Sequence, residues 1–315
     1  MSSPADTSTQ VLDSQHLDYI HHVSFDIYGR RMATCSGDRV VKVWDLQADG
    51  SWQLAGDWQA HRSGVEYLGW SHPEFGTLLA TASSDHDVKI WEERLEGYKK
   101  VWSQRALLSD ARRSVHCCEF APRHFGLQLA TGSADGVVRI YEAVDILNLS
   151  QWPLQGSIQA FGEPGVTSLS WCTGRFEAPT LVVGGSHLTI YRYASTARQW
   201  QALMTMPSQG PVTSVAWAPN VGRRFHWIAA TENQALHVYQ LDRKQDLELE
   251  AFHALEKDAP MWKCQWNVTG TVLASSGDAG IVQLWKADQH QQWKCVSQIH
   301  GDLTAAGKSM QCGGK

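Results

Sequence analysis

The stretch Leu79-Ala-Thr-Ala-Ser-Ser-Asp-His-Asp-Val-Lys-Ile-Trp91 consists of two short runs on either side of a polar turn. Each run alternates with a period of two, which is typical of β-strands. Ser84-Asp85, between the runs, belongs to the residue types that join two strands tightly. The stretch therefore predicts a β-hairpin that ends in a tryptophan.

The same hairpin recurs along the whole chain. Each copy ends in an apolar-x-apolar-aromatic motif, and the steps between the aromatic residues are 47, 50, 50, 48 and 46. The six motifs are Val41-Lys-Val-Trp44, Val88-Lys-Ile-Trp91, Val138-Arg-Ile-Tyr141, Leu188-Thr-Ile-Tyr191, Leu236-His-Val-Tyr239 and Val282-Gln-Leu-Trp285. Six copies of one unit of about 48 residues point to a repeat architecture.

Each unit contains two further predicted strands. An upstream strand ends in a bulky aromatic residue, at Phe25, Trp70, Phe120, Trp171, Trp217 and Trp266. A fourth strand opens with an aromatic residue in most copies, at Trp52, Tyr98, Trp152, Trp200 and Trp293. Four strands per unit is the composition of a propeller blade. We therefore predict an all-β, six-bladed β-propeller over residues 21–300, preceded by an N-terminal segment (1–20) and followed by a flexible, Gly-rich tail (301–315).

Composition narrows the classes of function. The 27 Lys and Arg residues against 32 Asp and Glu residues give a net charge of −5, which argues against nucleic-acid binding by bulk charge. The seven cysteines are scattered without a Cys-x-x-Cys pair, so we expect reduced core thiols and no zinc site. Because the first twenty residues lack an apolar core and no run approaches 18 apolar residues, we expect neither a secretion signal nor a membrane span.

The blade pattern resembles the WD40 family, although only Trp44-Asp45 keeps the dipeptide that names it. In the second repeat, four residues match the hydrogen-bonded tetrad by which WD40 blades resemble one another: His61, Thr81, Asp85 and Trp91. His253 is a second candidate for the tetrad histidine. Buried polar side chains must satisfy one another, so we expect a structural role for this set and no catalytic one.

The spacing of the repeats alone does not determine how the ring is closed. WD40 rings are typically sealed by an N-terminal strand that becomes the outer strand of the last blade. Here Trp293-Lys-Cys-Val-Ser-Gln-Ile299 already supplies a fourth strand to the last blade, so the segment Gln10 to Leu17 has no obvious place to fill. One hypothesis is an open ring with exposed flanks that invite a partner's strands. The other is that the N-terminal segment displaces Trp293–Ile299 and closes the ring.

A closer resemblance favours the open ring. The stretches Asp18-Tyr-Ile-His-His-Val-Ser-Phe-Asp26, Ala121-Pro-Arg-His-Phe-Gly-Leu-Gln-Leu-Ala130 and Asn267-Val-Thr-Gly-Thr-Val-Leu-Ala-Ser-Ser-Gly277 resemble the Seh (Sec-thirteen homologue) family of nucleoporins, and the similarity runs from about residue 16 to about 300. The resemblance implies a non-enzymatic scaffold subunit of the Y-shaped coat complex at the nuclear envelope. It also implies an open propeller, completed by an insertion blade from an α-solenoid nucleoporin.

The same resemblance implies membership of a second, coat-like complex at the lysosomal or vacuolar membrane, which signals nutrient status to the target-of-rapamycin kinase complex. Membrane association would come only through partners. The short tail 301–315 departs from the family pattern and leaves open any function carried by a longer C-terminus. The chain does not reveal which solenoid it binds.

The predicted partner site lies on the first strands of the first and last blades, where partner strands would add between the two blades. On blade one the candidates are Val23 and Phe25. On blade six they are Trp262, Cys264 and Trp266. For each of these residues the alternative is packing against its own neighbouring blade.

No motif supports catalysis or cofactor binding. His-Glu-x-x-His, Gly-x-Ser-x-Gly and a helix-opening Gly-x-Gly-x-x-Gly are all missing, so we expect no enzyme and no cofactor. Two alternatives remain in other classes: a self-closed WD40 receptor that binds short peptides, and an outer-layer propeller of a vesicle coat.

Overall fold

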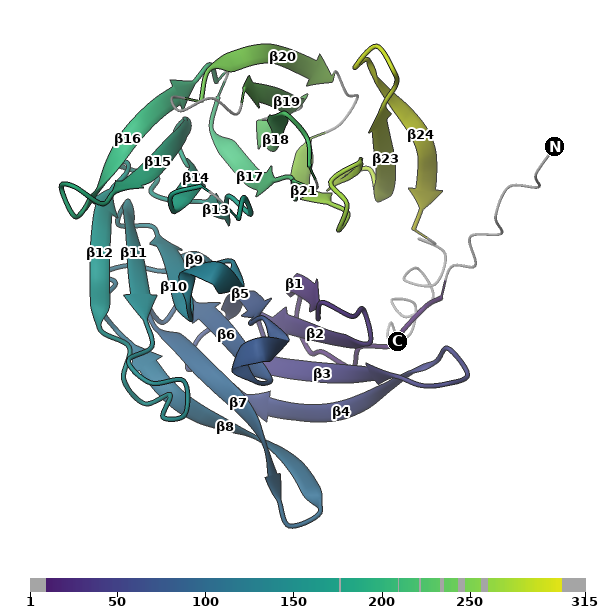
Figure 1. The fold of residues 1–315 in the computed structure, drawn as a ribbon. Coiled ribbons are helices and arrows are strands. Elements are labelled where there is room, and N and C mark those ends of the chain that lie inside the picture. The colour runs from purple at the N-terminus through teal and green to yellow at the C-terminus, as the bar shows by residue number, and fades with distance from the viewer. Residues whose placement is uncertain are drawn as a thin grey trace, which may run out of the picture.

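The computed structural model describes residues 10–301 except 176, 209, 221, 233–234, 243–246 and 256–259. Over this part of the chain, 24 strands form six antiparallel four-stranded sheets, each made of four consecutive strands in sequence order. The six sheets are the blades of a propeller (Figure 1). The predicted all-β, six-bladed fold is confirmed.

The first three blades contain twelve strands. Blade one comprises β1 (Ile20–Phe25), β2 (Arg31–Ser36), β3 (Val40–Leu46) and β4 (Trp52–Gln59). Blade two comprises β5 (Val65–Trp70), β6 (Leu78–Ser83), β7 (Val88–Glu96) and β8 (Lys99–Leu108). Blade three comprises β9 (Val115–Phe120), β10 (Gln128–Ser133), β11 (Val137–Glu142) and β12 (Leu154–Gln159). Two single-turn 3-10 helices, Pro73–Phe75 and Arg123–Phe125, lie between the first two strands of blades two and three.

The last three blades follow the same plan. Blade four comprises β13 (Ser168–Trp171), β14 (Thr180–Gly184), β15 (Leu188–Ala194) and β16 (Gln199–Met206). Blade five comprises β17 (Val212–Trp217), β18 (Phe225–Glu232), β19 (Ala235–Asp242) and β20 (Leu249–Leu255). Blade six comprises β21 (Met261–Trp266), β22 (Val272–Gly277), β23 (Ile281–Ala287) and β24 (Trp293–His300). No helix among the described residues is long and apolar enough to cross a membrane.

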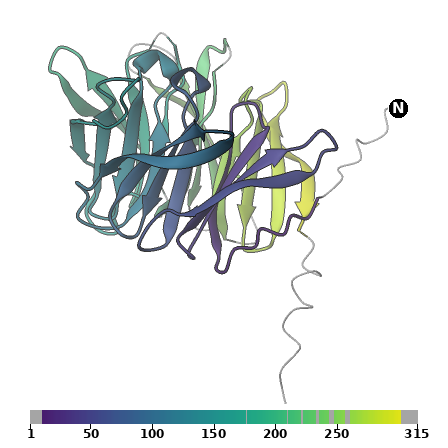
Figure 2. The ribbon, with the colours of Figure 1, turned by 90° about the horizontal axis from the view of Figure 1, so that it is seen from below.

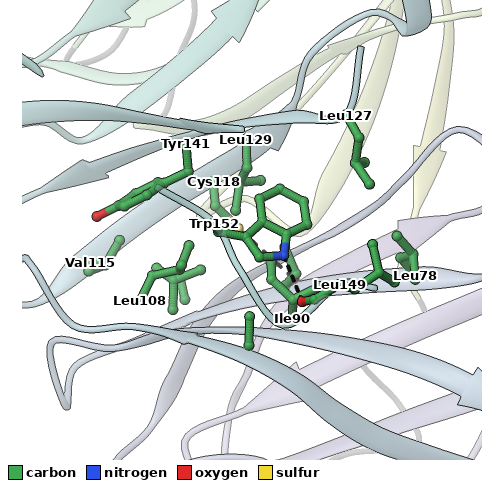
Figure 3. Close-up of a cluster of buried hydrophobic side chains, with 14 residues drawn as sticks. Leu78, Ile90, Leu108, Val115, Cys118, Leu127, Leu129, Tyr141, Leu149 and Trp152 are labelled. Carbon is green, nitrogen blue, oxygen red and sulfur yellow. Dashed lines mark hydrogen bonds between the residues drawn. The ribbon is translucent and has the colours of Figure 1, made fainter. Parts of the chain in front are cut away.

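Most of the core lies between neighbouring blades. In the cluster between blades two and three, Ile90 and Leu108 pack with Leu129 and Trp152, and the Trp152 Nε1 donates to the Leu149 carbonyl at 3.0 Å (Figure 3). Trp152 was expected to open a fourth strand, but β12 begins two residues later, and Trp152 fills the core instead. The apolar pattern thus stabilises blades in pairs, and each blade depends on its neighbours.

The inner strands of consecutive blades pack together five times along the chain: β1 with β5, β5 with β9, β9 with β13, β13 with β17, and β17 with β21. No comparable contact joins β21 to β1 within the described part of the chain. The ring of blades is not closed at this place, between blade one (purple) and blade six (yellow-green) (Figure 1). Seen from a direction at 90° to the first, the blades lie side by side around a disc (Figure 2).

The strands run from Ile20 to His300, close to the predicted limits of the propeller. The part of the predicted tail beyond Gly301, and residues 1–9 of the N-terminal segment, lie outside the described residues. One hairpin projects beyond the disc. It joins β7 to β8 and carries Tyr98, fully exposed, at its tip (Figure 1).

Candidate partner-binding site

A tryptophan at the end of an inner strand contacts the preceding blade in three places. The Nε1 of Trp70 in blade two donates to the Ser24 carbonyl of blade one at 3.1 Å. Trp171 in blade four donates to the Glu119 carbonyl at 3.1 Å, and Trp266 in blade six donates to the Ala216 carbonyl at 3.1 Å. The face of the inner strand that carries the final aromatic residue therefore points to the preceding blade.

In blade one this face has no preceding blade to contact. Phe25 occupies the position of these tryptophans, and its side chain is 52% exposed, while Val23, two residues earlier, is 41% exposed. The only ring contact recorded for Phe25 within the described chain is an edge contact with Trp52 of its own blade, at 5.7 Å between centroids. In the other blades the corresponding apolar face is covered by the preceding blade. In blade one this face is open to solvent.

In blade six the same face is covered by blade five. Cys264 is only 3% exposed, and its backbone N–H donates to the Ser214 hydroxyl at 3.4 Å. Trp266 is 8% exposed and bonds to Ala216. The expectation that these two residues offer a surface to a partner is therefore wrong, because their side chains point to the preceding blade rather than to the gap.

The face of blade six that points to the gap carries other residues. Trp262 lies at a register shift between Met261 and Lys263, which breaks the alternation with Cys264, and it lines the same hollow as Val23 and Gln265. It is 55% exposed, and its Nε1 bonds to the Asp278 carboxylate. Gln265 is exposed and stands at the position of Ser24, Glu119 and Ala216 in the earlier blades. Among the described residues, no tryptophan donates to its carbonyl. Sequence reasoning missed Gln265, although its place one residue before the final aromatic is the signal that identifies it.

The four residues of the predicted tetrad are connected by hydrogen bonds in blade two. The Nδ1 of His61 lies 3.1 Å from Asp85 Oδ1, and its Nε2 lies 2.8 Å from the Thr81 hydroxyl. The Trp91 Nε1 donates to the same hydroxyl at 3.0 Å. Burial lowers the pKa of His61, more than the nearby Asp85 carboxylate raises it, so the ring is neutral at pH 7.

Blade one contains a second complete tetrad that the sequence analysis did not find. His16 lies 2.8 Å from Asp38 Oδ2 through Nδ1 and 3.0 Å from the Thr34 hydroxyl through Nε2. The Trp44 Nε1 donates to Thr34 at 3.3 Å. His16 was missed because its spacings to the other members are two residues shorter than those of His61.

His253, the second candidate histidine, lies in the outer strand β20 of blade five and stands 6.0 Å from the ring of Trp227. It therefore takes no part in a tetrad. In blade six the Trp285 Nε1 bonds to Ser275 at 2.9 Å.

The inner strands surround a central channel with a hollow of about 320 Å³. On its wall, burial raises the pKa of the Glu119 carboxyl to about 8, against hydrogen bonds from Trp171 and Ser170 that lower it. The Lys263 ammonium lies 4.5 Å from the Tyr67 ring centroid, and burial lowers its pKa. The His22 ring stacks on Tyr67 at 3.8 Å. On this wall burial therefore disfavours the charged forms of both Glu119 and Lys263.

One cluster has the residue types of a metal site. The Cys172 thiol lies 3.2 Å from Glu177, and His226 Nε2 lies 3.0 Å from the same carboxylate. Trp217 Nε1 donates to His226 Nδ1 at 3.3 Å, which leaves the ring proton on Nε2, pointing at Glu177. These atoms thus hold blades four and five together through hydrogen bonds.

The blades, tetrads and inter-blade tryptophans define a WD40 propeller. A family model, "WD domain, G-beta repeat", matches residues 7–45, 52–92 and 102–142.

Curated relatives match nearly the whole chain. Nucleoporin SEH1-A of Xenopus laevis is 41% identical over 95% of this chain and 90% of its own length. Nucleoporin SEH1 of Homo sapiens is 40% identical over the same shares, and nucleoporin seh1 of Drosophila melanogaster is 41% identical over 92% and 87%. The chain belongs to the SEH1 family of nucleoporins.

Proposed function

We propose that this chain is a non-enzymatic structural subunit of the nuclear pore, within the Y-shaped coat complex at the nuclear envelope. Its partner is an α-solenoid nucleoporin that inserts strands between blade one and blade six. Family membership and the names of the relatives support the location. The observation that carries the mode of binding is the uncovered flank of β1 at Val23 and Phe25.

An inserted blade fits this flank in chemistry as well as in place. Its strands would cover Phe25 and Val23 as each blade covers the inner strand of the next, and a partner donor would reach the Gln265 carbonyl. Such β-addition combines backbone hydrogen bonds with apolar side-chain burial. The area buried by a whole blade exceeds that of a transient contact, so we expect a stoichiometric, long-lived complex.

The proposal extends to a second pool at the lysosomal or vacuolar membrane, in the coat-like complex that signals to the target-of-rapamycin kinase complex. This part rests on the family resemblance alone. The same gap would bind the solenoid of that complex, so the two assemblies would compete for one site. Membrane attachment would come from the partners, because the chain is acidic and its basic clusters are small.

The alternative of a self-closed peptide receptor requires an N-terminal strand in blade six. Among the described residues, the outer strand of blade six is β24, and the segment before β1 bonds to blade one through His16. The alternative of a vesicle-coat propeller has less support than the pore, since the similar proteins carry the name nucleoporin.

The test is purification of the C-terminally tagged chain from cells, with imaging of the same chain in living cells. We expect a solenoid protein in equal amount, amide protection of β1 in the complex relative to the chain alone, and fluorescence at the nuclear rim. A monomeric chain in cell extracts, or a complex in which β1 exchanges as fast as in the free chain, would contradict the proposal.

A further inference from the structure

One ring of side chains marks the middle of the central channel. Each member stands three residues before the final aromatic residue of an inner strand, so every blade contributes one. We call this set the waist ring. Its members are His22, Tyr67, Cys117, Ser168, Ser214 and Lys263. Because five of the six carry a nitrogen or oxygen at the side-chain end, the middle of the channel is polar.

The waist ring lies between two hollows. The hollow of about 320 Å³ extends toward the ends of the inner strands, where Trp70 and Trp171 line it. A second hollow, of about 930 Å³, extends toward their beginnings, where His21 and His116 line it. The members that line both hollows are His22, Tyr67, Ser168 and Lys263. A small molecule that passes from one hollow to the other therefore meets these side chains.

Lys263 differs from the other cations that the fold encloses. Lys42 Nζ donates to two backbone carbonyls, at 2.6 and 2.9 Å, and Lys89 Nζ donates to one at 2.8 Å. Arg139 pairs with a carboxylate at 2.7 Å. The largely buried Lys263 Nζ has no hydrogen bond or ion pair within the described residues and faces only the Tyr67 ring, at 4.5 Å. An enclosed ammonium without a partner is costly, so this one calls for a partner from outside the chain.

Two carboxyl groups line the hollows with Lys263, and neither forms an ion pair with it. Glu119 accepts from the Trp171 N–H at 3.2 Å, and burial raises its pKa to about 8, so it is mostly protonated at pH 7. Glu66, in the wider hollow, accepts from the Ser84 hydroxyl. The ammonium therefore keeps its positive charge unmatched.

The waist ring also holds unused hydrogen-bonding groups. The hydroxyl oxygens of Ser168 and Ser214 each accept a backbone N–H of the next inner strand, at 3.1 and 3.4 Å. Within the described part of the chain neither hydroxyl donates its own proton. The Nδ1 of His22 is buried and has no hydrogen-bond partner there either. Two hydroxyl donors, one ring nitrogen and one ammonium thus remain for a ligand.

We propose that the waist ring binds one small phosphate anion. Lys263 pairs with its charge, and the hydroxyls of Ser168 and Ser214 donate to its oxygens. Hydrogen phosphate carries both acceptor oxygens and an O–H donor, so it satisfies the His22 nitrogen in either tautomer. Every group of this site comes from the chain itself, and the inference goes beyond the proposed function without depending on the partner in the gap.

The first test is calorimetric titration of the purified chain with inorganic phosphate, in chloride buffer at constant ionic strength. We expect one phosphate per chain and at least tenfold weaker binding by Lys263→Met, as for the loss of a charge-assisted hydrogen bond. Lys263→Arg, which keeps the charge, should bind within about threefold of the native chain. Equal binding by the native chain and Lys263→Met, or no binding up to about 20 mM phosphate, would overturn the inference.

Lys294→Met is the matched control for that titration. Lys294 lies in the same blade, but its side chain is 69% exposed and pairs with Asp288 at 2.8 Å. We expect this variant to bind phosphate as the native chain does. Weakening by Lys294→Met equal to that by Lys263→Met would mean that phosphate responds to net charge only, and would overturn the inference.

A second measurement needs no loss of the lysine. Burial lowers the pKa of the Lys263 ammonium, and a bound anion stabilises its charged form, so we expect phosphate to raise this pKa. The readout is the NMR signal of carbon-13-labelled lysine, assigned with Lys263→Arg and repeated in Glu119→Gln because Glu119 titrates near pH 8. An unchanged Lys263 pKa at saturating phosphate would place the anion elsewhere and overturn the inference.

The complex with the solenoid provides the last test. We expect it to bind phosphate within about threefold of the chain alone, because the ligand groups all lie in the channel. Loss of binding in the complex would mean that the inserted chain itself supplies the partner of Lys263. That result would overturn the inference and leave the proposed function intact.

Discussion

Thr81 supplies the hydroxyl on which two buried rings of blade two depend. Both His61 Nε2 and Trp91 Nε1 bond to it, and all three side chains are buried. Replacement of the hydroxyl by a methyl group in Thr81→Val keeps the shape and leaves two buried polar nitrogens without their partner. We expect a loss of about 2 kcal/mol in the free energy of unfolding, measured by urea denaturation.

Thr131 provides the matched control for that measurement. It occupies the same strand position in blade three and is also buried, but among the described residues its hydroxyl bonds only to the Arg139 carbonyl, at 3.5 Å. We expect Thr131→Val to cost less than half as much as Thr81→Val. Equal losses in the two variants would mean that the tetrad adds nothing beyond ordinary burial.

Glu119 makes the stability of the propeller depend on pH. Its pKa of about 8 in the folded chain lies above the value near 4.3 of an unperturbed glutamate. Between these two values the folded state binds more protons than the unfolded state, so stability falls as the pH rises through this window. Below it, the contribution of Glu119 is fully present.

Glu119→Gln isolates this effect, because an amide does not ionise and its oxygen still accepts from the Trp171 N–H. As the pH rises from 6 to 8.5, we expect the native chain to lose about 2 to 3 kcal/mol of stability relative to the variant. The measurement is the urea midpoint of both proteins across that range. Parallel curves would show that the Glu119 carboxyl titrates normally.

At the scale of the strand, the inner strands show what a sequence pattern leaves undetermined. Period-two alternation separates the two faces of β21, but it does not tell which face points to the preceding blade. The choice depends on the direction in which the chain winds around the ring, and only the contacts of Trp70, Trp171 and Trp266 reveal it. Cys264 and Trp266 were therefore placed on the wrong side, while Val23 and Phe25 were placed at the open flank.

The six-fold repeat could be predicted from the sequence alone, for a physical reason. Each blade must bury the same inner and outer faces against its neighbours, so the alternation and the final aromatic residue recur at nearly constant steps. The loops between strands are less constrained. His16 precedes β1 by as many residues as His61 precedes β5, but the loop between β1 and β2 is two residues shorter than the loop between β5 and β6, so a search at fixed spacing misses the tetrad of blade one.

The contrast between the two faces of the inner strand gives a prediction for blade six. Trp266→Phe removes the bond to the Ala216 carbonyl and leaves space between blades five and six. We expect it to destabilise the chain by about 1 to 2 kcal/mol in urea denaturation, without changing the dissociation rate of the partner. Faster dissociation at unchanged stability would instead restore Trp266 to the partner site.

At the scale of the whole molecule, five contacts between the inner strands of consecutive blades hold the ring, and within the described residues no comparable contact joins β21 to β1. Val23→Asp with Phe25→Asp places two carboxylates on the flank that an inserted blade would cover. Charges are costly to bury without partners, so we expect recovery of the solenoid with the tagged chain to fall at least tenfold and the nuclear-rim signal to fall with it. Both native side chains are already about half-exposed in the chain alone, so its free energy of unfolding should change by no more than about 1 kcal/mol.

Leu154→Asp is the control. Leu154 is 44% exposed on the outer strand of blade three, on the other side of the ring, and its replacement should leave the complex intact. Loss of the solenoid with Leu154→Asp, or its full retention in the double variant, would move the partner site away from the gap.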